Sequence, residues 1–99
     1  MKMIKIKNNE ITISKGDDAV IGITLKGYTL HGGDKLVFTV GTPTPIVKEV
    51  ETLSIVLDAA DTANVKAGTY EYDIKLVFAT GEQQALIYPT QFVIKEVVE

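Results

Sequence analysis

Apolar and polar residues alternate along most of this chain, a pattern typical of strands with one buried and one solvated face. The alternation is clearest at Leu36, Phe38 and Val40, and again along 70–78. Turn-forming residues recur about every 8–12 residues between these runs. No stretch has the length and periodicity of a three-turn amphipathic helix. The pattern therefore predicts an all-β protein of seven to eight short strands, either an antiparallel sandwich or a small barrel.

Turns are predicted where glycine, proline and short polar residues gather. Such groups occur at 15–18, at 31–34 and at 79–82. The segment 41–45 contains two prolines and cannot be a central strand, because proline supplies no donor to the ladder. Pro89 should break or bend the last strand for the same reason.

The segment 53–78 carries the strongest topological signal. It contains two alternating strands, joined by a short helical turn near 58–65. Asp58 and Asp61 have the spacing of helix caps, and Gly68 is expected to end the segment because glycine accepts positive φ. Such a crossover between sheets favours an immunoglobulin-like antiparallel sandwich. The inward row of its first strand is predicted to be Leu53, Ile55 and Leu57.

A tyrosine just after the crossover could donate a hydrogen bond back to the turn, forming a tyrosine corner. Tyr70 and Tyr72 are the candidates. The alternative is that both rings pack in the core with their hydroxyls at its rim.

Composition limits the kinds of partner that the chain is expected to bind. The 99 residues fit one domain, 1–99, and the chain has no cysteine and a net charge of −3. All ten basic residues are lysine, so the planar fork that arginine offers to phosphate and guanine is missing. We expect no nucleic-acid partner. Residues 1–15 hold four lysines and one glutamate, whereas the rest holds six lysines and twelve acids. This asymmetry fits either a self-complementary subunit contact or random surface scatter.

No secretory or membrane segment is expected. Lysines interrupt the apolar run at the start, unlike in a signal peptide, and no stretch approaches the ~20 apolar residues of a membrane span. The lack of cysteine favours folding in a reducing cytoplasm.

Candidate catalytic and metal-binding residues are few. His31 is the single histidine and has Asp34 nearby, but the pair flanks a Gly-Gly turn, and an exposed turn histidine explains it better. Asp58 and Asp61 could form a catalytic carboxylate pair, although their spacing fits helix capping better. Asp17-Asp18 could offer calcium ligands together with Asp34 or Asp58/Asp61, although adjacent aspartates in a turn usually bond the local backbone.

The remaining motifs are weaker. Gly32-Gly33 lacks the context of a phosphate-binding loop, and Ser14 and Ser54 are not in a nucleophile elbow. Tyr28 and Tyr88 could form an aromatic patch for a sugar or a protein partner, or pack at an edge or in the core. We therefore predict no enzyme activity, no catalytic, cofactor-binding or metal-binding residue, and no cofactor.

Several segments together resemble a known family. They are Leu57–Ala63, Ala67–Leu76, Ile13–Asp17, Phe38–Val40 and Pro89–Ile94. This order resembles the small immunoglobulin-like domains of phage and prophage proteins from Gram-positive bacteria, which are related to the N-terminal domain of the baseplate upper protein. The matched positions are framework positions, so the resemblance carries over no binding site.

The resemblance implies a non-enzymatic structural part of a virion, in the tail, baseplate or host-adsorption apparatus. It implies contacts with other phage structural proteins, self-association, and a location in the virion or, before assembly, in the bacterial cytoplasm. Longer relatives continue into coiled or trimerising segments, whereas this sequence stops at Glu99. The alternative function is a carbohydrate-binding or adhesin-like module. For assembly, strand edges are the expected contact surfaces, and the lysine-rich first strand and the acidic last strand are the candidates.

Overall fold

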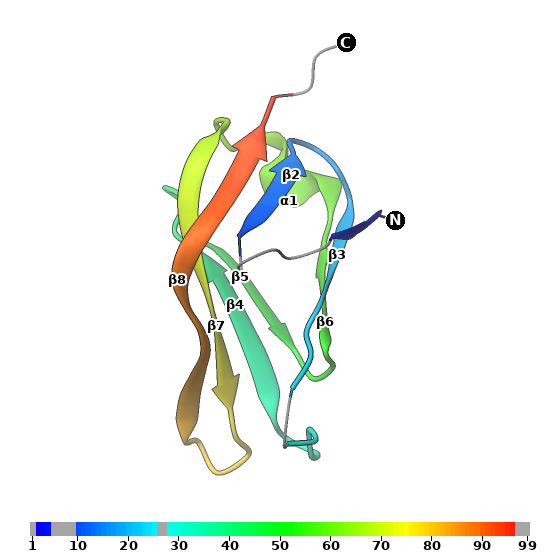
Figure 1. The fold of residues 1–99 in the computed structure, drawn as a ribbon, viewed down its shortest axis with the longest axis vertical. Coiled ribbons are helices and arrows are strands. Elements are labelled where there is room, and N and C mark those ends of the chain that lie inside the picture. The colour runs from blue at the N-terminus through cyan, green and yellow to red at the C-terminus, as the bar shows by residue number, and fades with distance from the viewer. Residues whose placement is uncertain (1, 5–9, 26–27, 97–99) are drawn as a thin grey trace.

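The computed structural model describes residues 2–4, 10–25 and 28–96, without the side chains of 2–4 and 88. Eight strands and one short helix form within them (Figure 1). The elements are β1 (Lys2–Ile4), β2 (Ile11–Ser14), β3 (Ala19–Gly22), β4 (Lys35–Val40), β5 (Ile46–Val50), β6 (Ser54–Leu57), α1 (Ala59–Ala63), β7 (Gly68–Val77) and β8 (Gln83–Lys95). Part of the N-terminal segment predicted as a lysine-rich first strand, residues 5–9, falls outside the described residues.

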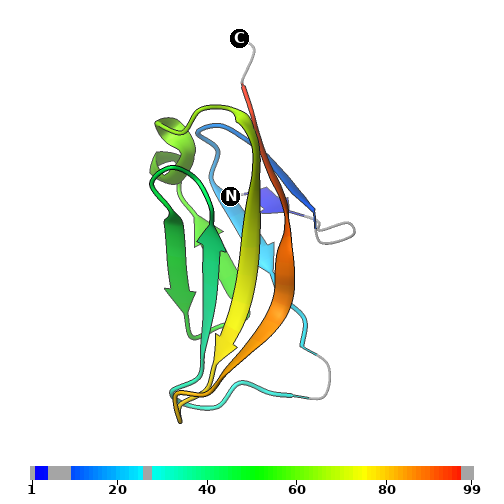
Figure 2. The same cartoon turned by 90° about the vertical axis from the view of Figure 1, so that its left-hand side faces the viewer.

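The strands form two sheets that face each other, as Figures 1 and 2 show. One sheet has the order β1-β3-β6 and the other β2-β8-β7-β4-β5. The chain leaves the first sheet after β3, makes β4 and β5 in the second, returns for β6, and crosses through α1 to β7 and β8. This is the order of an immunoglobulin-like sandwich. The predicted fold class, the strand number and the helical turn near 58–65 are confirmed.

The two N-terminal strands depart from antiparallel pairing. β1 runs parallel to β3, and β2 runs parallel to β8, with Ile11 opposite Phe92 and Ile13 opposite Ile94. All other described pairs are antiparallel. The chain therefore changes sheet between β1 and β2 and contributes a strand to each.

The core follows the predicted period of two. Leu36, Phe38 and Val40 are fully buried, as are Ile55 and Leu57. The Phe38 ring lies 5.5 Å from Tyr72 and 6.0 Å from Phe92, measured between ring centroids. Burial raises the pKa of the Tyr72 hydroxyl to about 12, since the interior disfavours phenolate.

One core position was predicted wrongly. Leu53 is 38% exposed, because it lies in the bend before β6, which begins only at Ser54.

The crossover contains a tyrosine corner. The Tyr70 hydroxyl donates to the Lys66 carbonyl oxygen at 2.5 Å, whereas Tyr72 lies in the core with 1% exposure. Each of the two alternatives therefore holds for one of the tyrosines. The predicted role of Gly68 was wrong, because α1 already ends at Ala63, and Gly68 begins β7 without positive φ.

β8 bends where proline predicts it. The β7–β8 register shifts twice, between Tyr72 and Ile74 and again between Ile74 and Lys75. Each shift places one extra residue in β8, and Pro89 lies within the first. Because bulges absorb the missing donor, the strand continues past the bend to Lys95.

None of the helices in the described part of the chain has the length and apolar character needed to cross a membrane.

Candidate functional site

The outer edge of β5 is the best candidate contact surface. β5 ends the five-stranded sheet and pairs only with β4, in an unbroken register from Ile46 to Val50. Val47 is 53% exposed, the highest exposure among the large hydrophobic residues that the structure describes as exposed. A regular strand edge has unpaired backbone groups that another strand can join.

A shallow groove lies between β5 and α1. Pro45, Val47 and Lys48 line one side, and Ala60, Asn64 and Val65 line the other. We call this surface, together with the outer edge of β5, the β5 groove. Its lining combines apolar side chains with the Asn64 amide and the charged pair Lys48 and Asp61, a composition suited to an extended peptide.

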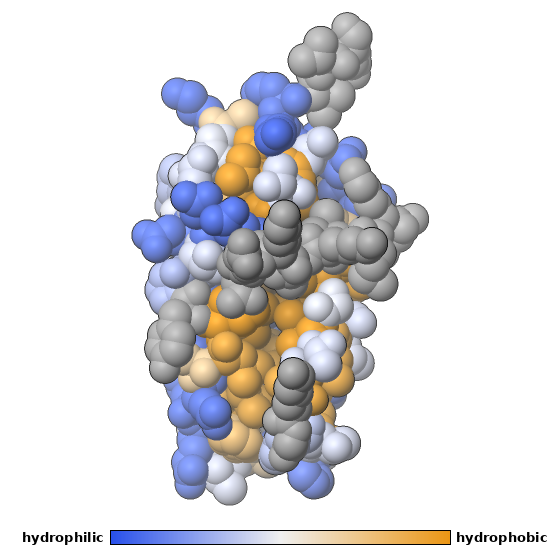
Figure 3. Space-filling model, viewed as in Figure 1, coloured by the Kyte–Doolittle hydropathy of each residue, from blue (hydrophilic) through white to orange (hydrophobic). Residues whose placement is uncertain are grey.

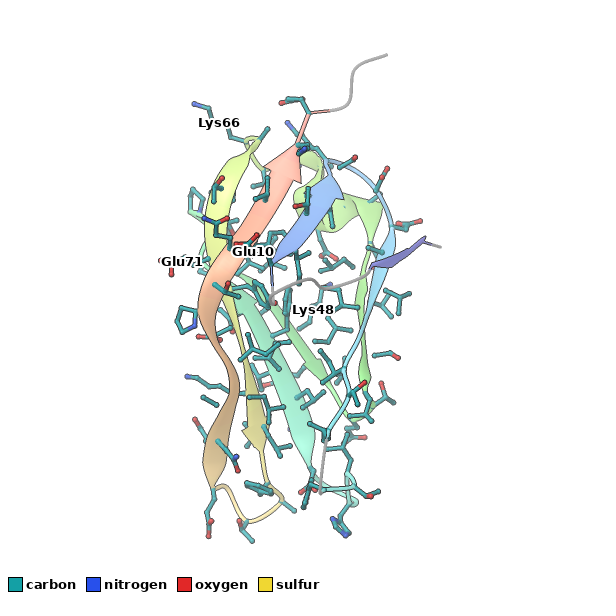
Figure 4. All side chains as sticks on the ribbon, in the orientation of Figure 1. Glu10, Lys48, Lys66 and Glu71 are labelled. Carbon is teal, nitrogen blue, oxygen red and sulfur yellow. The ribbon has the colours of Figure 1, made fainter. Side chains whose placement is uncertain are left out.

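Lys48 does not protect this edge as lysines commonly do. Its ammonium is 2.9 Å from a carboxylate oxygen of Asp61 on α1, and the two side chains are only 27% and 18% exposed. Figure 4 labels Lys48. A lysine on an edge strand discourages pairing, because an incoming strand would remove water from its charge. The ion pair already neutralises this charge, so β5 lacks that deterrent.

The flank of the β5 groove is acidic. Glu49, Glu51 and Asp58 are exposed on β5 and on the segments that follow it. Asp61 is already engaged, by Lys48 and by the backbone N–H of Asp58 at 2.7 Å. The three exposed acidic residues lie on and after β5, outside the set of residues that line the groove.

The other described edges differ. β1 lies at the end of the three-stranded sheet, as predicted for the first strand. β8 lies between β7 and β2, and β2 covers only 92–95, so the prediction for the last strand holds only for its first part. Figure 3 shows apolar surface on the side between β8 and β3. Pro89 and both register shifts fall along this uncovered part of β8, and such irregularities hinder strand addition.

His31 and Asp34 meet in a hydrogen-bond network with Tyr28. The Tyr28 hydroxyl donates to Asp34 Oδ2 at 2.5 Å, and the His31 backbone N–H donates to the same oxygen at 2.9 Å. The Ala79 backbone N–H donates to Asp34 Oδ1 at 3.0 Å. The His31 ring nitrogen Nδ1 lies 3.1 Å from the Tyr28 hydroxyl.

This network holds the 28–34 loop against the β7–β8 hairpin at one end of the sandwich. Asp34 is 3% exposed and ties the 28–34 loop to the β7–β8 hairpin, while the Tyr28 ring packs edge-on against Phe78 with 5.5 Å between centroids. The hydrogen bond from Tyr28, followed by those from His31 and Ala79, lowers the pKa of Asp34. The same bond raises the pKa of Tyr28. Sequence reasoning missed Tyr28 as the partner of Asp34.

The lowered pKa gives a pH-dependent prediction. Asp34 is more acidic in the folded chain than its ordinary value of 3.8, so its contribution to stability is fully present above that value. The contribution is lost as the pH falls through the folded pKa. We expect Asp34→Asn to lower the urea midpoint at pH 7, and the gap from wild type to shrink below about pH 4.

Urea unfolding from pH 7 to pH 2.5 measures this gap. Glu71→Gln removes one negative charge from an exposed position of β7 and serves as the control. A gap for Asp34→Asn that stays constant with pH would contradict the prediction.

The structure does not bring Asp34 together with the other residues proposed as calcium ligands. Asp18 Oδ1 accepts from the backbone N–H of Ala59 at 2.7 Å, joining the 15–18 turn to the start of α1. The backbone N–H of Gly16 donates to the buried Thr62 hydroxyl oxygen at 2.9 Å in the same contact. This turn and the 31–34 turn lie at opposite ends of the sandwich (Figure 1), so Asp34 cannot join Asp17 and Asp18. The described residues include no group of three or more His, Cys, Asp or Glu arranged to hold a metal ion.

The other residues considered from the sequence lie in a turn or at the ends of strands. Gly33 has positive φ in the turn where the Asp34 N–H donates to the His31 carbonyl oxygen. Ser14 ends β2, and Ser54 begins β6. The proposed aromatic patch is not tested, because the side chain of Tyr88 lies outside the described part.

No protein-family model matches the chain, and no curated protein is significantly similar to it.

Proposed function

We propose that this protein is a non-enzymatic structural or assembly module of a phage or prophage particle. It acts through protein–protein contacts in the tail, baseplate or an accessory virion component. It is made in the bacterial cytoplasm and becomes part of the virion.

The exposed edge of β5 is the observation that carries this proposal. The edge of β5 is unbroken, Val47 is half exposed, and Lys48 is already paired with Asp61. Such an edge is suited to bind another chain. The proposal that the protein belongs to a phage particle comes from the segments that resemble phage immunoglobulin-like domains. Tyr28, one of the two aromatic residues that the carbohydrate-binding alternative needs, is engaged by Asp34 and packs against Phe78.

Light scattering with size-exclusion chromatography tests the proposal. We expect the chain to self-associate as its concentration rises, or to bind the tail proteins encoded beside it. Val47→Lys should weaken that association about tenfold, because it places an unpaired charge on the edge.

Thr69→Lys is the matched control, since it adds the same charge at an exposed position of the inner strand β7. A protein that stays monomeric at high concentration and binds none of the co-encoded tail proteins would overturn the assembly function.

A further inference from the structure

We propose that the β5 groove binds β5 of a second copy of this chain. The two strands run antiparallel about a two-fold axis beside Val47, and the two larger sheets join into one. This inference rests on the proposed assembly function, because it names the partner of the same contact surface.

The direction of the hydrogen bonds in β4 decides which backbone groups of β5 are free. The Gly41 N–H donates to the Glu71 carbonyl oxygen at 2.8 Å, and this bond continues the β4–β7 register by one residue. In an antiparallel ladder the backbone groups of successive residues point to opposite neighbours. Since the groups of Gly41 point to β7, those of Val40 and Phe38 point to β5.

Val40 and Phe38 lie opposite Ile46 and Lys48, which therefore direct their own backbone groups to β4. The N–H and C=O groups of Val47 and Glu49 then point the other way, to the free edge of the sheet. They form a regular row, because the β4–β5 register has no shift from Ile46 to Val50. A second antiparallel strand can pair with this row while the β4–β5 pair stays intact.

The side chains that would lie opposite each other select the register. With the axis beside Val47, the two exposed valines face each other, and Glu49 faces Pro45 of the second copy. An axis beside Glu49 would oppose the two carboxylates, and an axis beside Lys48 would oppose the two lysines. Like charges directly opposite destabilise a sheet, whereas an apolar pair stabilises it. The Val47 register is therefore favoured over the other two.

The fit of β5 to itself is the argument for a second copy as the occupant. In the Val47 register the two Val47 residues exchange both of their backbone hydrogen bonds. Pro45 has no N–H to donate, but its position falls at the end of the paired stretch, where water can reach the Glu49 carbonyl oxygen. Lys48 stays paired with Asp61 of its own subunit at 2.9 Å, so its charge enters the contact already neutralised.

The symmetry of the contact limits the size of the assembly. Both copies use the same surface, so the contact is isologous and closes as a dimer. Light scattering should therefore show a monomer–dimer equilibrium as the concentration rises. Because the contact joins backbone groups and valines, its strength should change little with salt.

Cysteine substitution tests both the contact and its register. The chain has no cysteine, so each variant carries a single thiol. Residues in a hydrogen-bonded pair have Cα atoms about 5.5 Å apart, which lies within the range of about 4.4–6.8 Å that a disulfide spans. Under mild oxidation, we expect Val47→Cys to form a disulfide-linked dimer at least about tenfold faster than a variant with its thiol outside the contact.

Two variants serve as controls, and non-reducing gels give the linking rates. Glu49→Cys adds a thiol to the same strand, but in the Val47 register the two copies of residue 49 lie about 14 Å apart along the strands. Thr69→Cys adds a thiol at an exposed position of the inner strand β7 and measures random collision. Both should link only at the slow collisional rate. Far-UV circular dichroism establishes that each variant is folded.

The outcomes separate this inference from the assembly function. If the wild type self-associates but Val47→Cys links no faster than Thr69→Cys, the β5–β5 contact is overturned and the assembly function stands. If Glu49→Cys links faster than Val47→Cys, or if linking occurs only in a mixture of these two, the Val47 register is overturned. A wild type that is monomeric but binds a co-encoded tail protein also overturns the contact between copies.

Discussion

Replacing Phe38 with alanine should lower the free energy of unfolding by about 3–5 kcal/mol. Phe38 has no exposed surface, lies on β4, an inner strand of the larger sheet, and contacts Tyr72 and Phe92. Truncation removes buried apolar area and leaves a cavity that the surrounding strands cannot fill. Small domains unfold with only about 5–15 kcal/mol, so much of the stability should be lost.

Chemical unfolding in urea, followed by far-UV circular dichroism, measures the Phe38→Ala effect. Val56→Ala is the control, because Val56 is 39% exposed on β6 and loses little buried area. Its expected cost is within about 0.5 kcal/mol. Equal costs for the two variants would contradict a core centred on the three aromatic rings.

Gly33→Ala should destabilise the fold by about 2–4 kcal/mol, for two separate reasons. Gly33 has φ of 91°, a conformation that L-residues adopt at a cost. A Cβ at this position would also lie 2.8 Å from the Ala79 Cβ. The Ala79 N–H is held by Asp34, so yielding to the new methyl group would strain that hydrogen bond.

Gly81→Ala separates the two costs. Gly81 has a similar φ of 95°, but no atom within 4 Å of the added Cβ. It should cost only the backbone term, about 1–2 kcal/mol. Urea midpoints of both variants give the difference, and equal midpoints would show that the Ala79 contact has no energetic effect.

The fold was predictable because burial alternates with period two. Leu36, Phe38 and Val40 could be assigned to the core from spacing alone, and the crossover could be located from its helical turn. The parallel pairing of β1 with β3 and of β2 with β8 could not be predicted. Alternation determines which face of the sheet a residue occupies, and it does not determine the direction of the neighbouring strand.

The candidate site was harder to predict. The sequence indicated the first and last strands as contact edges and did not indicate β5. Strand order decides that β5 is an edge, and order depends on how the chain crosses between sheets. The ion pair of Lys48 with Asp61 joins residues on two different elements and has no local sequence signal. The same holds for the Ala79–Asp34 hydrogen bond, which spans 45 residues.

The parallel pairing of β2 with β8 has a mechanical consequence. When the chain is pulled from its two ends, the force first meets β1, which pairs with β3; once β1 is released, the force enters at the start of β2 and leaves at the end of β8. These points lie at opposite ends of the stretch in which Ile11 to Ser14 pair with Phe92 to Lys95. Tension therefore acts along the strands and loads all of these backbone bonds at once, in shear. The folded domain should therefore resist extension at this pair more than it would if the two strands separated one bond at a time.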